Sequence, residues 1–151
     1  MRLDLVCGRE QSVSDARSYA MYVPEGFAVV TPYIFVEKAE DYVRFLESAF
    51  GAHETGRSVG KDGRIANSQL RFGSATIMIS EASAQFPASR AALYLLYVAD
   101  ADAAVQAAER AGAERIMDVA DMPYGDRQGG VRDTAGNIWW VSQRLIPEPY
   151  F

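Results

Sequence analysis

The chain carries an internal repeat, and this repeat restricts its fold more than any other feature of the sequence. Residues 30–81 contain an apolar run, an amphipathic segment that stops at Gly51, and two strand-like runs joined by a tight turn. Residues 92–145 contain the same elements in the same order, with Gly112 as the stop. Because each unit has one helix among several strands, the order predicts an α+β fold built from two equivalent modules.

Length, charge and cysteine content narrow the classes of function. A chain of 151 residues suits one domain, or two small halves that share a core. Its net charge of −5 argues against a nucleic-acid partner. Cys7 is the only cysteine, so neither an intrachain disulfide nor a cysteine-ligated metal site is expected. The chain shows neither a signal peptide nor a run that could span a membrane, so the expected partners exclude membranes and the expected location is the cytoplasm.

The first residues lie outside both repeats. The stretch SVSDARSYAMYV is compatible with a short helix, and Pro24 and Gly26 mark a break after it. We therefore predict an N-terminal arm over residues 1–27 and a single domain over residues 28–151, with modules at about 30–81 and 92–145. The arm is expected either to lie on the surface or to cover a groove of a neighbouring subunit.

Three stretches of the chain resemble a known family: PYIFVEKAEDYVRFLESAFGA, DGRIANSQLRFG and YGDRQGGVRDTAGNIWW. They are similar to the vicinal-oxygen-chelate superfamily, which includes glyoxalase I, bleomycin-resistance proteins and extradiol dioxygenases, and within it to the PhnB-type proteins. The resemblance implies two βαβββ modules that form a curved, cup-shaped mixed sheet with helices on its outer face. It also implies a homodimer.

Enzymes of that superfamily hold a divalent metal in the cup, with His, Glu or Gln ligands on the first and last strand of each module. None of the four matching positions carries a good ligand for such an ion: Thr31, Met78, Leu93 and Trp140. His53, the only histidine, is expected in a loop after Gly51. Gln69 and Glu81 could form a weak site, but they supply fewer ligands than a catalytic metal needs. We therefore expect no metal and no other cofactor.

The two-residue period of a strand predicts which side chains line the cup. Trp139 is expected to pack against a helix, which leaves the adjacent Trp140 facing the cup. The same alternation predicts an apolar lining, typical of a small-molecule site, from Tyr33, Phe35, Met78, Leu95, Tyr97 and Trp140. Four polar residues are expected to join it: Asn67, Gln69, Arg71 and Ser142. Indole and phenol rings favour a planar ligand through stacking.

Catalytic residues cannot be named from the sequence. It has no phosphate-binding loop, and one histidine, His53, does not easily serve a catalytic triad. Asp126 and Arg127 are expected to pair with each other and stabilise a turn. Glu81 is the one carboxylate near the end of an inner strand, where a role as general base would require a raised pKa.

Three hypotheses for the function follow. The first is a metal-free binding protein of the glyoxalase and bleomycin-resistance type, which holds a planar, partly apolar antibiotic or metabolite in the cup; sequestration for antibiotic resistance has a precedent in the resembling family. The alternative is a glyoxalase-like lyase, isomerase or dioxygenase, with metal at unusual positions or with none. The third is an interaction protein whose cup is filled by its own side chains.

Overall fold

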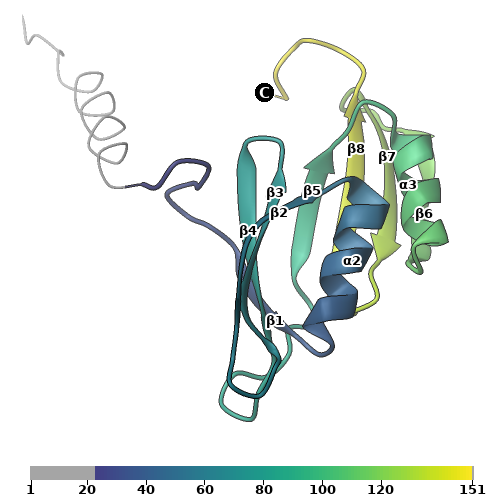
Figure 1. The fold of residues 1–151 in the computed structure, drawn as a ribbon. Helices are drawn as coiled ribbons and strands as arrows, with labels where there is room; N and C mark the ends of the chain where they lie inside the picture. The colour runs from purple at the N-terminus through teal and green to yellow at the C-terminus, as the bar shows by residue number, and fades with distance from the viewer. Residues whose placement is uncertain (1–22, 151) are drawn as a thin grey trace, which may run out of the picture.

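The computed structural model describes residues 23–150, which form two modules of the same topology (Figure 1). The first module runs in the order β1 (Tyr33–Val36), α2 (Ala39–Phe50), β2 (His53–Val59), β3 (Ile65–Phe72) and β4 (Ala75–Glu81). The second runs in the order β5 (Leu93–Tyr97), α3 (Ala101–Arg110), β6 (Glu114–Asp121), β7 (Asp126–Arg132) and β8 (Ile138–Arg144). The α+β prediction of two βαβββ modules is confirmed. Most of the predicted arm, up to residue 22, lies outside the described residues.

Each module forms its own mixed sheet of four strands. The strand orders are β1-β4-β3-β2 in the first sheet and β5-β8-β7-β6 in the second sheet. In both sheets the first strand pairs in parallel with the last strand of its module, and the remaining pairs are antiparallel. Tyr33 therefore lies beside Met78 in the first sheet, as Leu95 lies beside Trp140 in the second.

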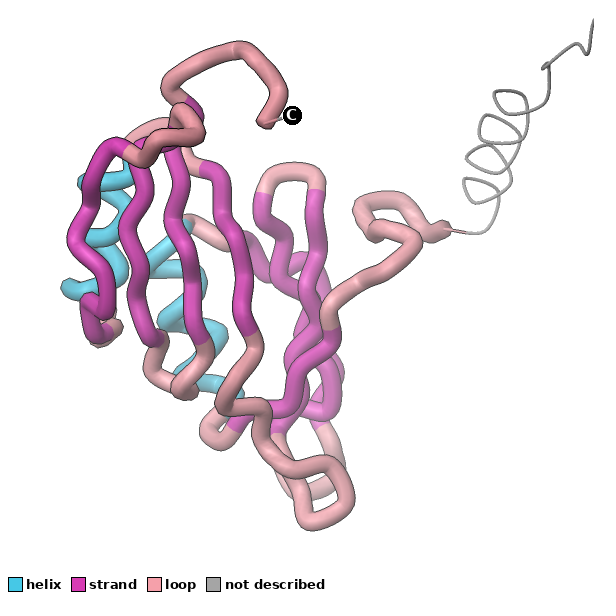
Figure 2. Tube along the Cα trace, turned by 180° about the vertical axis from the view of Figure 1, so that it is seen from behind, coloured by secondary structure: helices cyan, strands magenta, loops and turns pink. Residues whose placement is uncertain are grey.

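The two sheets do not join into one. Among the described strands, no Cα atom of the first sheet lies within 8 Å of a Cα atom of the second. The modules contact each other through α2 and α3 and through side chains such as Phe72 of β3, whose ring stacks on that of Trp139 in β8 at 5.6 Å. Figure 2 shows both helices behind the strands of the second sheet. Each sheet thus packs one face against helices and leaves the other face without a helix, and we call the latter its open face. The cup predicted from the sequence is present as two open faces that are not closed within one chain.

The core lies between the sheets and the helices. The buried residues of α3 are Ala101, Val105 and Ala108, and those of α2 are Ala39, Tyr42, Val43, Phe45, Leu46 and Ala49. Gly51 ends α2 in the left-handed conformation (φ 65°), as the glycine stop predicts. Trp139 joins the modules, because its ring lies 4.9 Å from that of Phe50 and 4.4 Å from that of Tyr94. None of the helices in the described part of the chain is long and apolar enough to cross a membrane.

Candidate functional site

The open face of the first sheet carries a row of aromatic side chains. The ring centroids of Tyr33 and Phe35 are 5.2 Å apart, and Phe35 stacks in turn on Phe86 at 5.0 Å. Tyr33 Oη lies 2.7 Å from Ser80 Oγ, and Ser80 donates to the carbonyl oxygen of Ala66. Since the Ser80 hydrogen is already used, Tyr33 is the donor to Ser80. The row is therefore held in place by one hydrogen bond and two stacking contacts.

Met78, Gln69 and Asn67 extend this face across β4 and β3. Strand pairing places Met78 between Tyr33 and Gln69. Asn67 pairs with Ser58 on the far side of β3, and both Asn67 and Gln69 are partly exposed. The first sheet thus brings together four of the predicted lining residues, Tyr33, Phe35, Gln69 and Met78, with Asn67 next to them.

Arg71 lies at the far end of this face, under the segment that precedes β1. A Cβ atom at Gly26 would lie only 1.9 Å from Arg71 Nη2, and Gly26 has a φ of 81°, so this close approach requires glycine. Thr76, which pairs with Arg71, donates to the carbonyl oxygen of Gly26. Arg71 Nε is buried and has no hydrogen-bond partner among the described residues. The segment around Gly26 therefore covers part of the Arg71 guanidinium.

The open face of the second sheet is apolar and exposed along β5. Leu93, Leu95 and Tyr97 keep 58%, 48% and 53% of their surface exposed. Trp140 lies beside Leu95 on one side and Gly130 on the other. A Cβ atom at Gly130 would lie 2.2 Å from Trp140 Cζ3, so the indole occupies the space that a side chain at position 130 would need. The prediction for the tryptophan pair is confirmed for Trp139, which is 2% exposed in the core, while Trp140 lies half-buried in strand register with exposed Leu95.

A polar network occupies the end of this open face beyond Trp140. Its centre is Asp126, which is 1% exposed and accepts hydrogen bonds from Ser142 Oγ at 2.6 Å, Arg144 Nη1 at 2.7 Å and Tyr150 Oη at 2.5 Å. Tyr97 Oη lies 2.8 Å from Tyr150 Oη. The segment after β8 therefore folds back over the sheet and ties Tyr97 to the buried carboxylate; Figure 2 shows this segment curling over the end of the strands.

Two further side chains complete the network on the other side of Asp126. Gln128 Nε2 donates to Ser142 Oγ at 3.3 Å, and Tyr124 donates to Gln128 Oε1 at 2.7 Å. Burial alone would raise the pKa of Asp126, but the hydrogen bonds from Ser142, Tyr150 and Arg144 outweigh it and lower the pKa. The carboxylate is therefore ionised at neutral pH.

One sequence-based expectation for the acidic residues, the pairing of Asp126 with Arg127, is wrong. Asp126 and Arg127 do not pair with each other, because adjacent strand residues face opposite sides of a sheet. Arg127 instead faces α3 and binds Asp102 through Nε and Nη2, at 2.5 and 3.0 Å. Glu81 does not serve as a general base in the cup: it accepts hydrogen bonds from the backbone N–H groups of Lys38 and Ala39 at the start of α2.

The surroundings of Glu81 explain its pKa. Burial acts to raise it, yet the hydrogen bonds from the Ala39 N–H group and the Arg64 guanidinium prevail, so the pKa lies below its ordinary value. Glu81 also faces α2, whereas Gln69 lies opposite Met78 on the open face. The weak metal site considered for this pair is therefore excluded by strand geometry.

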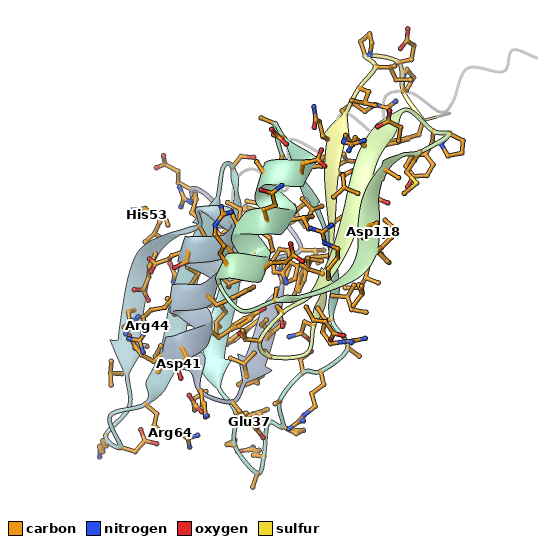
Figure 3. All side chains as sticks on the ribbon, turned by 90° about the vertical axis from the view of Figure 1, so that its right-hand side faces the viewer. Glu37, Asp41, Arg44, His53, Arg64 and Asp118 are labelled. Carbon is orange, nitrogen blue, oxygen red and sulfur yellow. The ribbon has the colours of Figure 1, made fainter. Side chains whose placement is uncertain are left out.

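The residues of this chain do not fit the metal centre of the superfamily. The matching positions hold Thr31, Met78, Leu93 and Trp140, which are poor ligands for a catalytic divalent ion. His53 begins the edge strand β2, is exposed, and lies near the margin of the molecule in Figure 3. Within residues 23–150, no group of three or more His, Cys, Asp or Glu side chains could hold a metal ion.

A groove of about 450 Å³ lies on the helix side, away from both open faces. Its walls include the first turns of α2 and the turn at Thr134 and Ala135. Among its charged side chains, Arg44 binds Asp41 at 2.7 Å (Figure 3) and Glu37 binds Arg90 at 3.1 Å, whereas Lys38 makes no ion pair with another described residue. The groove contains none of the residues that the sequence predicts for the cup lining.

Sequence reasoning placed its candidates on two separate sheets and missed most of the polar network. Leu95, Tyr97, Trp140 and Ser142 lie together on the second sheet. Asp126 and Gln128 alternate with Arg127 along β7, so a strand-period argument could have found them. Arg144 likewise follows Ser142 at the two-residue period of β8 and lies opposite Asp126, whereas Tyr150 gave no such signal because it lies beyond the last strand.

Two βαβββ modules with aromatic open faces define the class to which this protein belongs. A sequence profile of the Glyoxalase/Bleomycin resistance protein/Dioxygenase superfamily matches residues 26–141, and the chain belongs to this superfamily. An uncharacterized protein of Mycobacterium bovis, Mb0911c, is 32% identical over 124 residues, which cover 76% of this chain and 82% of the relative.

Two solved structures share the fold. The product of Arabidopsis thaliana gene At5g48480 has a TM-score of 0.64 at 29% identity, over 75% of this chain and 96% of that one. TnmS3, an antibiotic-binding protein from Streptomyces sp. CB03234, has a TM-score of 0.60 at 21% identity, over 80% of this chain and 95% of that one. At that identity the second comparison shows the fold alone.

Proposed function

We propose that the protein binds a planar, partly apolar small molecule, such as an antibiotic or a metabolite, on its open faces and without a metal ion. The observation that carries this proposal is the half-buried Trp140, beside the exposed Leu95 and Tyr97. A large apolar surface left in water marks a binding site more often than a structural feature. An antibiotic-binding protein of the same fold supports the choice of ligand.

The donor set supports the metal-free part of the proposal. An indole and a thioether occupy two of the four ligand positions, and neither supplies the oxygen or imidazole donors of the superfamily's enzymes. We expect protein purified without chelator to contain far less than one Zn, Ni, Mn or Fe per chain, and EDTA to leave the melting temperature unchanged. A stoichiometric metal, or a large loss of melting temperature with EDTA, would favour the enzyme alternative.

We further propose that two copies associate in the cytoplasm and close the cup. Both open faces keep large apolar side chains exposed to solvent, including Tyr33, Leu93 and Leu95. A second copy of the chain could cover this surface with the same surface of its own, as in a two-fold symmetric dimer. Light scattering on the full chain is expected to give twice the monomer mass; a monomer at micromolar concentration would contradict this part. We also propose that the protein belongs to the PhnB-type branch of the superfamily, because the three stretches PYIFVEKAEDYVRFLESAFGA, DGRIANSQLRFG and YGDRQGGVRDTAGNIWW resemble that branch.

Binding can be tested through the fluorescence of the two tryptophans. We expect 2-naphthol, a planar aromatic probe, to quench the fluorescence of the wild-type protein. Stacking contributes about 0.5–1.5 kcal/mol beyond burial, so Trp140→Ala should weaken binding roughly tenfold. Trp140→Phe, which keeps a ring, should lose less. Equal affinity of Trp140→Ala and the wild type would remove Trp140 from the site.

A further inference from the structure

In the polar network on the second sheet, Asp126 determines which group donates in each hydrogen bond. An ionised carboxylate can only accept hydrogen bonds. Tyr150 Oη and Ser142 Oγ both contact Asp126 Oδ2, so both hydroxyl hydrogens must point at the carboxylate. The hydrogen bond that Tyr150 donates to Asp126 also raises the pKa of Tyr150, so this phenol keeps its proton at neutral pH.

On one side of Asp126, the same reasoning determines the donor in the hydrogen bond between Tyr150 and Tyr97. Because the Tyr150 hydrogen is used on Asp126, the contact of 2.8 Å between Tyr97 Oη and Tyr150 Oη requires Tyr97 to be the donor. The Tyr97 hydrogen therefore points into the network. Its oxygen lone pairs are left for the open face, where Tyr97 keeps 53% of its surface exposed.

On the other side of Asp126, the hydrogen bonds run through Ser142 and Gln128 to Tyr124, and their donors are determined in the same way. Ser142 has given its hydrogen to Asp126, so it can only accept, which fixes the Gln128 amide with its NH₂ group toward Ser142. The Gln128 oxygen then faces Tyr124, which must donate to it at 2.7 Å. Tyr124 is 44% exposed, so its oxygen is a second accessible acceptor that has no hydrogen to give.

In the described part of the chain, the cation that contacts this network is Arg144, and it is already bound. Arg144 binds Asp126 and the carbonyl oxygen of Tyr124, and it also contacts the carbonyl of Glu148. Its guanidinium carbon lies 4.1 Å from the centre of the Tyr150 ring. The Arg144 guanidinium therefore already has its partners within the network, including the face of the Tyr150 ring.

From this geometry we infer that the ligand presents a hydrogen-bond donor, such as a phenol hydroxyl, an amide N–H or an amine, to Tyr97 and Tyr124. The inference rests on the proposed function and names the chemical class that the site selects. Side chains two residues apart on one strand face lie about 7 Å from each other, so a ring stacked at Leu95 and Trp140 can place a substituent at Tyr97. A carboxylate or ether at that place would meet only acceptors.

Three naphthalene probes of similar shape test the inference: 2-naphthol, which carries a donor, 2-methoxynaphthalene, which has none, and the anion 2-naphthoate. We expect the full-length wild type to bind 2-naphthol about tenfold more tightly than either of the other two. In Tyr97→Phe/Tyr124→Phe this preference should fall to about twofold or less. Tyr94→Phe is the matched control, because Tyr94 lies on the same strand but faces the core, and it should keep the full preference.

A third variant tests the direction of the hydrogen bonds rather than their presence. In Tyr150→Phe the Tyr97 hydrogen loses its acceptor and becomes available to a ligand, so binding of 2-methoxynaphthalene should improve relative to 2-naphthol. If the wild type binds 2-naphthol and 2-methoxynaphthalene equally well, the inference is wrong and the proposed binding function stands. If none of the probes binds, both the proposed function and the inference are overturned.

Discussion

A buried aspartate begins strand β7 and another directly follows it, and the two accept hydrogen bonds on opposite faces of the second sheet. Asp126 begins the strand and accepts hydrogen bonds from side chains of the open face. Asp133 follows the strand, is 5% exposed, and accepts from Tyr42 Oη at 2.7 Å and Trp139 Nε1 at 2.8 Å on the helix side. It also accepts from the backbone N–H groups of Ala135 and Asn137, both at 2.9 Å.

The difference lies in where the donors come from. The donors to Asp133 are core side chains and a tight turn, so this carboxylate joins α2 of the first module to the last hairpin of the second. Among the donors to Asp126 is Tyr150, whose hydroxyl also contacts that of Tyr97, and both tyrosines are exposed to solvent. Two aspartates of similar burial therefore differ in role: Asp133 binds groups of the core, whereas Asp126 fixes the orientation of hydroxyl groups on the open face.

The most severe test of this contrast is Asp133→Ala. The substitution leaves a phenol, an indole N–H and two backbone N–H groups without an acceptor in a buried place. We expect the free energy of unfolding to fall by about 3–4 kcal/mol, near the upper end for a single substitution. Urea denaturation measures it.

Asp118→Ala is the matched control, since Asp118 has 91% of its side chain exposed and makes only a 3.5 Å ion pair with Arg115 (Figure 3). Its effect should stay within about 0.5 kcal/mol. If Asp133→Ala costs no more than this control, Asp133 does not join the modules.

The second test concerns pH, through Asp126→Asn. A carboxylate whose pKa is lowered on folding stabilises the protein above the unfolded pKa of about 3.9 and loses this effect as pH falls through the folded value. We expect Asp126→Asn to be less stable than the wild type by about 1–2 kcal/mol at pH 7, with the difference shrinking below pH 4. Urea midpoints at pH 7, 5 and 3 measure it, and a difference that does not change with pH would contradict the ionised state of Asp126.

The fold could be predicted from the sequence because it depends on periodic patterns that both modules repeat. The strand alternation placed Trp139 in the core, and the glycine at position 51 predicted the end of α2. The separation of the sheets could not be predicted, because it depends on how α2 packs against α3. The network around Asp126 was missed since Tyr150 lies beyond the last strand, where no period relates it to β7.

The third test is Gly130→Ala, at the point on β7 where the indole of Trp140 lies. The added Cβ atom would lie 2.2 Å from the ring, so the ring must move, and we expect a loss of about 1 kcal/mol together with a changed near-ultraviolet circular dichroism signal. Gly56→Ala on β2 is the matched control, because its nearest contact would be 3.5 Å, to Gln69 Oε1. Equal melting temperatures of the two variants would mean that Gly130 does not position the indole.

The smallest expected effect belongs to Tyr94→Phe, near the Asp133 end of the molecule. Tyr94 Oη is buried without a hydrogen-bond partner among the described residues, so its removal should leave stability unchanged or raise it by less than about 1 kcal/mol at pH 7. Burial, with a further contribution from the Asp133 charge, raises the pKa of Tyr94 to about 12.

The raised pKa gives this variant a signature in alkali. A group whose pKa is raised on folding stabilises the protein fully below its unfolded pKa, here about 10, and loses this contribution as pH rises toward the folded value. The wild type should therefore lose stability between pH 10 and 12 more steeply than Tyr94→Phe in urea denaturation. Parallel curves would mean that Tyr94 ionises as readily in the folded chain as in the unfolded one, and that the Asp133 side of the sheet is open to water as the Asp126 side is.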